Sequence, residues 1–199
     1  VVVSTAGKPL QDQLFTKDLP AVLQALGTNA DIAVLKGRAN YVCKYRLAVA
    51  MSEGRLPSPE AAKDLRRIAE FAQIDPVGDR AACHGVPEDS PAWPFATSSA
   101  ENCLGNKCPH FTECLVNQAR SRAKNADIAV VNHHLYLSAM ALMAEAEGAG
   151  DDARMLPKAD VVIFEKCSEG GGNTAVSSGG MMIPNNRDRA YTYLAKTYA

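Results

Sequence analysis

Asn102–Cys114 reads NCLGNKCPHFTEC, in which three cysteines stand in the spacing C-x4-C-x5-C. A fourth cysteine, Cys43, ends the upstream stretch KGRANYVC, which begins at Lys36. Four thiolates at one point are the ligand set of an iron–sulfur cluster or a structural zinc ion, because both are held by soft, deprotonated sulfur. The sequence therefore predicts a metal centre around which the rest of the chain is organised.

Core packing is the alternative explanation for these cysteines, because free cysteine is commonly an inert buried residue. Three cysteines in one short polar stretch with glycine and proline fit a core poorly, so we expect a metal site. Structural zinc sites favour ligand pairs about two to four residues apart, and the x4 and x5 spacing here fits that pattern poorly. Spacing alone leaves both an iron–sulfur cluster and zinc open.

The composition is that of an ordinary soluble globular protein, with 199 residues, 47% hydrophobic side chains and a formal net charge of −1. No apolar run approaches the roughly 18 residues of a membrane span, and Val1–Val3 is too short for a signal peptide. We therefore expect a cytoplasmic protein without membrane contact. In that compartment cysteines are metal ligands or free thiols more often than disulfides.

Short apolar runs alternate with helical patterns along the chain. Buried strands are predicted at residues 1–4, 31–36, 126–132 and 159–164. Leu10–Leu26 has helical spacing interrupted by Pro20, which predicts two short helices joined at a kink, and a further helix is predicted at 135–147. This alternation predicts an α/β fold with a parallel sheet buried on both faces.

The cysteine-bearing segment 39–125 is then a mainly helical insertion between two strands. Helical patterns cover about 41–70 and 115–124, and Ser58-Pro59-Glu60 is a helix-start signal. Residues 75–101 are rich in Pro, Ser, Asp and Gly and are predicted to form an irregular loop. We expect Trp93 and Phe95 to anchor that loop.

Basic residues gather at both ends of this segment, near Tyr41 and Tyr45. Such residues most often form a solvated surface, but a channel that neutralises phosphates and stacks bases needs the same types. Sequence alone leaves the two interpretations open. The candidate DNA contacts are Lys36, Arg38, Tyr41, Lys44, Arg46, Lys107, Arg120 and Arg122.

Three stretches resemble one family. Ser4–Leu14 (STAGKPLQDQL) looks like helicase motif Ia, Leu35–Cys43 looks like the segment that delivers a first cluster ligand, and Asp127–Leu135 (DIAVVNHHL) looks like the strand and turn after the cluster. With the cysteine spacing and Ala92-Trp93-Pro94, they are similar to the DinG and YoaA branch of the XPD-like iron–sulfur DNA helicases of bacteria. The resemblance covers about residues 1–164.

The resemblance implies a partial RecA-like motor domain, formed by 1–38 and 126–164, with an iron–sulfur domain at 39–125 inserted in it. It implies a [4Fe–4S] cluster, ATP-driven 5′-to-3′ movement with Mg²⁺ in the complete enzyme, single-stranded or forked DNA as substrate, and replication or repair proteins as partners. The implied cluster ligands are Cys43, Cys103, Cys108 and Cys114. Asn132 and His133 are expected to close the third strand near the nucleotide cleft.

Other family motifs are missing. Gly7-Lys8 lacks the second glycine and the Ser or Thr of a Walker A loop. Where the family has Asp-Glu-Ala-His, the chain has Glu165 and Lys166, and a lysine cannot orient the attacking water through a carboxylate. We therefore expect no ATP hydrolysis by this chain alone.

The tail, 165–199, resembles nothing in the family. Two other hypotheses stay open for the chain. One is a non-catalytic nucleic-acid- or protein-binding module with a structural zinc, and the other is a redox protein that uses the cluster for electron transfer.

Overall fold

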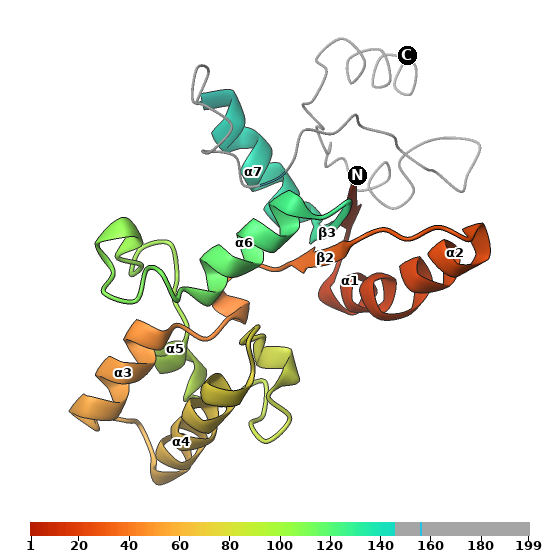
Figure 1. Cartoon of the computed structure of the whole chain (residues 1–199). Helices are drawn as coiled ribbons and strands as arrows, with labels where there is room; N and C mark the ends of the chain where they lie inside the picture. The colour runs from red at the N-terminus through yellow and green to blue at the C-terminus, as the bar shows by residue number, and fades with distance from the viewer. Residues whose placement is uncertain (146–155, 157–199) are drawn as a thin grey trace, which may run out of the picture.

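Three parallel strands form the sheet of the computed structural model, which describes residues 1–145 and Leu156 (Figure 1). The strands β1 (Val2–Thr5), β2 (Ile32–Leu35) and β3 (Ile128–Asn132) lie in the order β1-β3-β2. The middle strand is buried from Ala129 to Val131, as expected for a strand covered on both faces. The predicted α/β class and parallel sheet are confirmed. The strand predicted at 159–164 lies outside the described residues.

The chain between β1 and β2 is helical and contains two short α-helices, as predicted. It forms α1 (Lys8–Gln13), a π-helical turn η1 (Leu14–Asp18) and α2 (Leu19–Leu26). Pro20 lies in the first turn of α2, and the wider π turn before it relieves the clash that proline makes with the preceding turn. Gly27, with a φ of +62°, ends α2.

The segment between β2 and β3 is mainly helical, as predicted. Its elements are η2 (Arg38–Asn40), α3 (Lys44–Glu53), α4 (Pro59–Ile74), η3 (Arg80–Ala82), α5 (Trp93–Ala96), η4 (Gly105–Lys107) and α6 (Leu115–Asn125). Ser58 caps α4 by accepting a hydrogen bond from the Ala61 N–H at 3.1 Å. Figure 1 shows α6 running from the sheet toward α3, α4 and α5, and α7 (His133–Glu145) leaving β3 on another side.

Two hydrophobic clusters stabilise the structure. One, within the segment between β2 and β3, packs Trp93 against residues of α3 and α4, including Leu65 and Ile68. The other lies on the sheet and includes Leu35, Val131 and residues of α6. Trp93 is buried, its Nε1–H donates to the Pro87 carbonyl at 2.8 Å, and Phe95 packs against the same cluster. The predicted anchoring of the loop by these two aromatic residues is confirmed.

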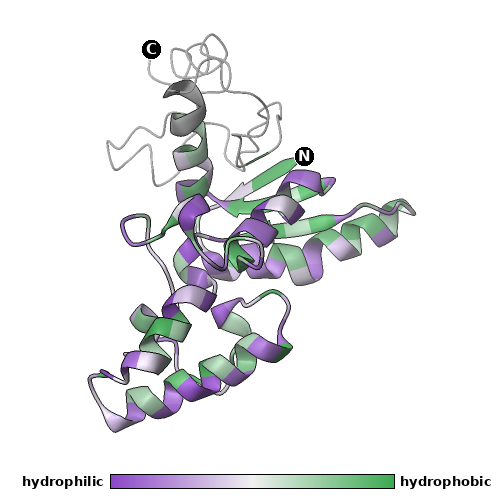
Figure 2. Ribbon diagram, turned by 60° about the vertical axis from the view of Figure 1, so that its left-hand side comes forward, coloured by the Kyte–Doolittle hydropathy of each residue, from purple (hydrophilic) through white to green (hydrophobic). Residues whose placement is uncertain are grey.

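Helix α2 carries hydrophobic residues along its length (Figure 2), and Val22 and Leu26 are exposed. In α4 the apolar and polar residues alternate at helical spacing, so that Leu65 and Ile68 are buried while Arg66 is exposed. In the described part of the chain, no helix is both long enough and apolar enough to cross a membrane.

Candidate metal centre

All four predicted ligand cysteines line one cavity of about 410 Å³. Cys43 directly precedes α3, Cys114 directly precedes α6, and Cys103 and Cys108 lie on either side of η4. Cys103 is exposed, the other three are half-buried, and all are free thiols. The fold thus brings Cys43 to the same cavity as three cysteines far downstream.

Short turns shape the cysteine loop. The Cys108 N–H donates to the Gly105 carbonyl at 3.1 Å, Phe111 N–H to Cys108 at 3.0 Å, and Cys114 N–H to Phe111 at 3.3 Å. Gly105 has a φ of +57°, which favours glycine because other residues meet a steric penalty there. These successive turns keep three thiols beside one space without a regular helix or strand.

The surroundings of the cavity are electropositive. Helices α3 and α6 begin directly after Cys43 and Cys114, and a helix N-terminus carries partial positive charge. Arg38 and Arg120 also line the cavity. Burial and the nearby charge of Arg38 lower the pKa of Arg120, while Cys114 and Cys103 act in the opposite direction. This arrangement stabilises negative charge among the sulfur atoms.

The four thiols match the ligand set of an iron–sulfur cluster and equally that of a structural zinc ion. Among the described residues, no three Cys, His, Asp or Glu side chains are grouped as a site for a metal ion as they stand. His110 also lines the cavity, but four thiols already supply the ligands of a cluster.

One ion pair joins the residue after Cys43 to the cysteine loop. Lys44, the first residue of α3, has its Nζ 2.8 Å from Oε2 of Glu113, which directly precedes Cys114. The hydrogen bond from Lys44 and its positive charge lower the pKa of Glu113. The pair is exposed to solvent, so it orients the two ends of the site more than it stabilises the fold.

The candidate DNA contacts divide by exposure. Lys107 and Arg122 are exposed, while Arg38, Lys44, Arg46 and Arg120 are half-buried. Arg46 Nη2 donates to the Pro94 carbonyl at 3.0 Å, so this guanidinium already has one partner within the protein.

Lys36 and Tyr41, two of the predicted DNA contacts, are buried in the interior. The Lys36 side chain is 3% exposed, and its Nζ lies 2.7 Å from carboxylate oxygens of both Asp12 and Asp79. The Tyr41 hydroxyl accepts a hydrogen bond from the Lys36 N–H at 3.1 Å. No sequence pattern links Asp12 and Asp79 to Lys36, because the three lie in different elements.

At the carboxyl edge of the sheet, Asn132 caps α7 by accepting a hydrogen bond from the Leu135 N–H at 2.7 Å. His133 is therefore the first residue of a helix, which corrects the expectation that it closes the strand. Ligands of parallel α/β sheets bind at this edge. The assignment of Asn132 and His133 to a nucleotide cleft stays a prediction.

Comparisons with known proteins give a consistent result, although no protein-family model matches the chain. The chain is 42% identical to the ATP-dependent DNA helicase YoaA of Haemophilus influenzae over 168 residues, which are 84% of this chain and 26% of that protein. It is also 42% identical to YoaA of Escherichia coli over 170 residues, covering 85% of this chain and 26% of that protein. The chain belongs to the DinG and YoaA family.

The wider family is matched as well. The ATP-dependent helicase DinG of Mycobacterium tuberculosis is 34% identical over 189 aligned residues, covering 85% of this chain and 27% of that protein. The chain thus spans about a quarter of the length of these DinG and YoaA relatives. Glu165 and Lys166, at the expected Asp-Glu-Ala-His position of the family, lie outside the described residues.

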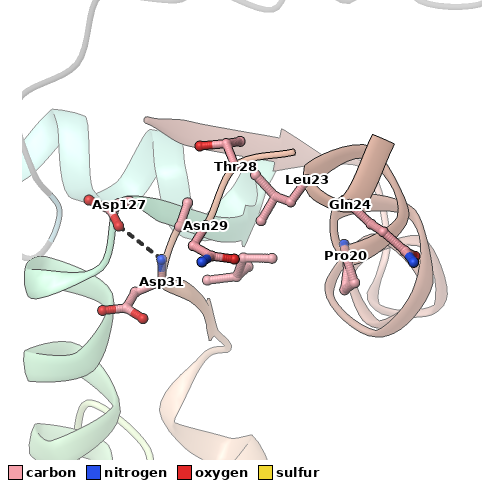
Figure 3. Close-up of a pocket in the computed structure, with 9 residues that line it drawn as sticks. Pro20, Leu23, Gln24, Thr28, Asn29, Asp31 and Asp127 are labelled. Atoms are coloured by element: carbon pink, nitrogen blue, oxygen red, sulfur yellow. Dashed lines mark hydrogen bonds between the residues drawn. The ribbon is translucent and has the colours of Figure 1, made fainter. Parts of the chain in front are cut away.

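A second hollow in this DinG- and YoaA-family chain lies at the amino edge of the sheet, before β2 and β3 begin (Figure 3). Its volume is about 690 Å³, and its lining includes Thr28, Asn29, Asp31 and Asp127. The Asp31 N–H donates to the Asp127 carboxylate at 2.9 Å, so one of its two acids is already engaged by the backbone. This edge is opposite the one where parallel sheets bind ligands.

Proposed function

We propose that this chain is part of the motor region of an ATP-dependent DNA helicase, with an inserted iron–sulfur domain at 39–125. Residues 1–38 and 126–164 are proposed as the interrupted motor domain, and 165–199 as a diverged tail. The observation that carries the proposal is the single cavity shared by Cys43, Cys103, Cys108 and Cys114. The named activity of the YoaA and DinG relatives supports it.

In this proposal the four cysteines hold a [4Fe–4S] cluster, and the positive charges of Arg38 and Arg120 balance its thiolate ligands. A bound cluster supplies metal–thiolate bonds, whose free energy would support a segment rich in turns and loops. Cys43 would thereby be tied to the loop that precedes α6. DNA contact is assigned to the exposed Lys107 and Arg122 and to the half-buried Arg38, Lys44, Arg46 and Arg120.

The substrate in this proposal is single-stranded or forked DNA. Complete relatives are named as ATP-dependent DNA helicases, and ATP with Mg²⁺ would act in the complete enzyme. For this chain alone we expect DNA binding without ATP hydrolysis, because its sequence contains no Walker A loop.

Anaerobic purification followed by iron and sulfide analysis tests the centre. We expect about four iron and four sulfide per chain, and a brown protein absorbing near roughly 400 nm. Cys43→Ser, Cys103→Ser, Cys108→Ser and Cys114→Ser should each lower the iron content several-fold. Cys83→Ser is the matched control, because Cys83 is buried in the hydrophobic cluster around Trp93 and does not line the cavity.

Two results would replace the proposal. Stoichiometric zinc without sulfide, lost in the same four variants, would indicate a binding module with a structural zinc. An intact cluster with no salt-dependent affinity for single-stranded DNA would favour an electron-transfer protein, because phosphate contacts make DNA binding salt-dependent.

A further inference from the structure

Lys36 connects helix α1 to the mainly helical segment between β2 and β3. Its ammonium group lies 2.7 Å from Asp12 on α1 and 2.7 Å from Asp79, which lies in the segment between β2 and β3. Burial opposes the charge of Lys36, but the hydrogen bonds and charges of both carboxylates outweigh it and raise its pKa. The lysine is therefore charged at neutral pH and held by two acids at once.

The neighbours of Asp79 reach the cysteine cavity through direct contacts. The Val42 N–H donates to the Gly78 carbonyl at 2.9 Å, which fixes the residue before Cys43. Gly78 also lies against Leu115, the residue after Cys114, because a Cβ added at Gly78 would collide with the Leu115 Cδ1. Residues 78 and 79 thus contact Lys36 on one side and the neighbours of two ligand cysteines on the other.

Helix α1 is held equally firmly on its side. Gln11, beside Asp12, is fully buried, and its Nε2 donates to the Leu35 carbonyl at 2.8 Å and to the Val130 carbonyl at 3.0 Å. A displacement of α1 would move the carboxylate of Asp12 relative to Lys36. Because the Lys36 side chain is buried whereas that of Asp12 is 45% exposed, the cost of losing this pair falls on the buried ammonium.

We propose that Lys36 is a positioning residue that couples α1 to the cysteine cavity, through Asp12 on one side and Asp79 with Gly78 on the other. The path is contiguous: α1, Lys36, residues 78 and 79, and then the residues adjoining Cys43 and Cys114. The coupling itself needs no bound cluster or DNA. It goes beyond the proposed helicase activity, for which it would give a route between the motor and the inserted domain.

Hydrogen exchange of the full 199-residue chain, followed by mass spectrometry, tests the coupling. Asp12→Asn should speed amide exchange in residues 76–79 and 41–43 by roughly threefold to tenfold, the size of couplings measured along packed networks. Asp79→Asn should speed exchange in α1 by a similar factor. The effect of the double variant should differ from the sum of the two single effects, because the two variants remove different partners of the same buried ammonium.

Two variants serve as controls. Asp18→Asn removes a carboxylate from the same helical run that contacts only the exposed Gln13 side chain, and it should leave exchange in 76–79 unchanged. Lys36→Arg keeps the charge and should retain most of the coupling, whereas Lys36→Met should lose it. Asp12 is 45% exposed in its side chain, so Asp12→Asn keeps the test valid even where a change at Lys36 prevents folding.

Exchange changes confined to α1 in Asp12→Asn, and to 76–79 in Asp79→Asn, would overturn the coupling and leave Lys36 as a local packing residue. That result is independent of the metal and DNA measurements. Loss of coupling with normal iron content would leave the proposed function standing. Normal coupling in a protein that binds neither iron nor DNA would support the coupling and overturn the proposed function.

Discussion

Ser4 Oγ lies 2.7 Å from His133 Nδ1, joining β1 to the first residue of α7. The two residues are far apart in sequence, but β1 and β3 are parallel neighbours, so their carboxyl ends meet. Burial lowers the pKa of His133. An unprotonated ring nitrogen of neutral histidine can accept a hydrogen bond from the Ser4 hydroxyl, whereas both ring nitrogens of an imidazolium are donors.

The chain should lose stability on acidification through His133. A histidine whose folded pKa lies below its unfolded value of about 6.5 takes up a proton on unfolding, so stability falls as the pH drops below about 6.5. Urea unfolding midpoints should therefore decrease less between about pH 7 and pH 5 in His133→Gln than in the unsubstituted chain. His134→Gln, at the exposed neighbouring position, should keep the full decrease. Equal pH dependence in all three proteins would contradict this role for His133.

Gln11 should matter for stability more than a polar residue usually does. Gln11→Ala should lower the free energy of unfolding by about 2–4 kcal/mol, because two hydrogen bonds to buried carbonyls and the side-chain volume are lost. Gln11→Met restores volume without the donors and should recover part of that loss. Gln13→Ala, on the exposed side of the same helix, should change stability by less than about 0.5 kcal/mol. Chemical denaturation measures the stability of all three variants. Equal effects at positions 11 and 13 would count against a stabilising role for the Gln11 hydrogen bonds.

Gly78→Ala should be costlier than Gly27→Ala. Both glycines have a positive φ, +66° and +62°, where an added Cβ costs about 1–2 kcal/mol. At Gly78 the Cβ would also collide with Leu115, whereas Gly27 has nothing within 4 Å. Overpacking typically adds about 1–3 kcal/mol. Thermal unfolding compares the pair, and a difference near zero would show that the Leu115 side chain moves aside at little cost.

The exposed basic residues near the cavity should contribute to DNA affinity. Lys107→Ala with Arg122→Ala should weaken single-strand binding and reduce the slope of log affinity against log salt by about 1.4, roughly 0.7 for each phosphate contact. Lys63→Ala with Arg66→Ala removes the same charge from exposed positions of α4 and serves as the control. Fluorescence anisotropy titrations at several salt concentrations measure the slope. Equal slopes in both double variants would assign the effect to net charge alone.

Local patterns predicted much of this structure, and tertiary contacts account for the rest. The strand positions, the Ser58 cap and the helix at α6 follow from patterns of a few residues, which is why they could be predicted. Lys36 could not be placed, because a lysine after a strand and before Gly37-Arg38 is ordinarily solvated, and its carboxylate partners come from distant elements. The π-helical turn also depends on helix geometry that composition does not specify.

For the cysteines, sequence spacing indicated a shared centre, and in the structure all four line one cavity. What spacing could not supply is the approach of Arg120 to them, which depends on where α6 begins. The half-buried state of most of the basic residues could not be predicted either, because the clustering of basic residues in a sequence does not show how deeply each one is buried.

The strand order β1-β3-β2 has a consequence for synthesis on the ribosome. In the described part of the chain, β3 lies between β1 and β2, so this three-stranded sheet stays open until residues 128–132 emerge. At roughly 5–20 residues per second, residues 39–125 are released over several seconds before that happens. The cysteine-bearing segment therefore leaves the exit tunnel before β3, the strand that completes the sheet, so this segment can begin to fold first.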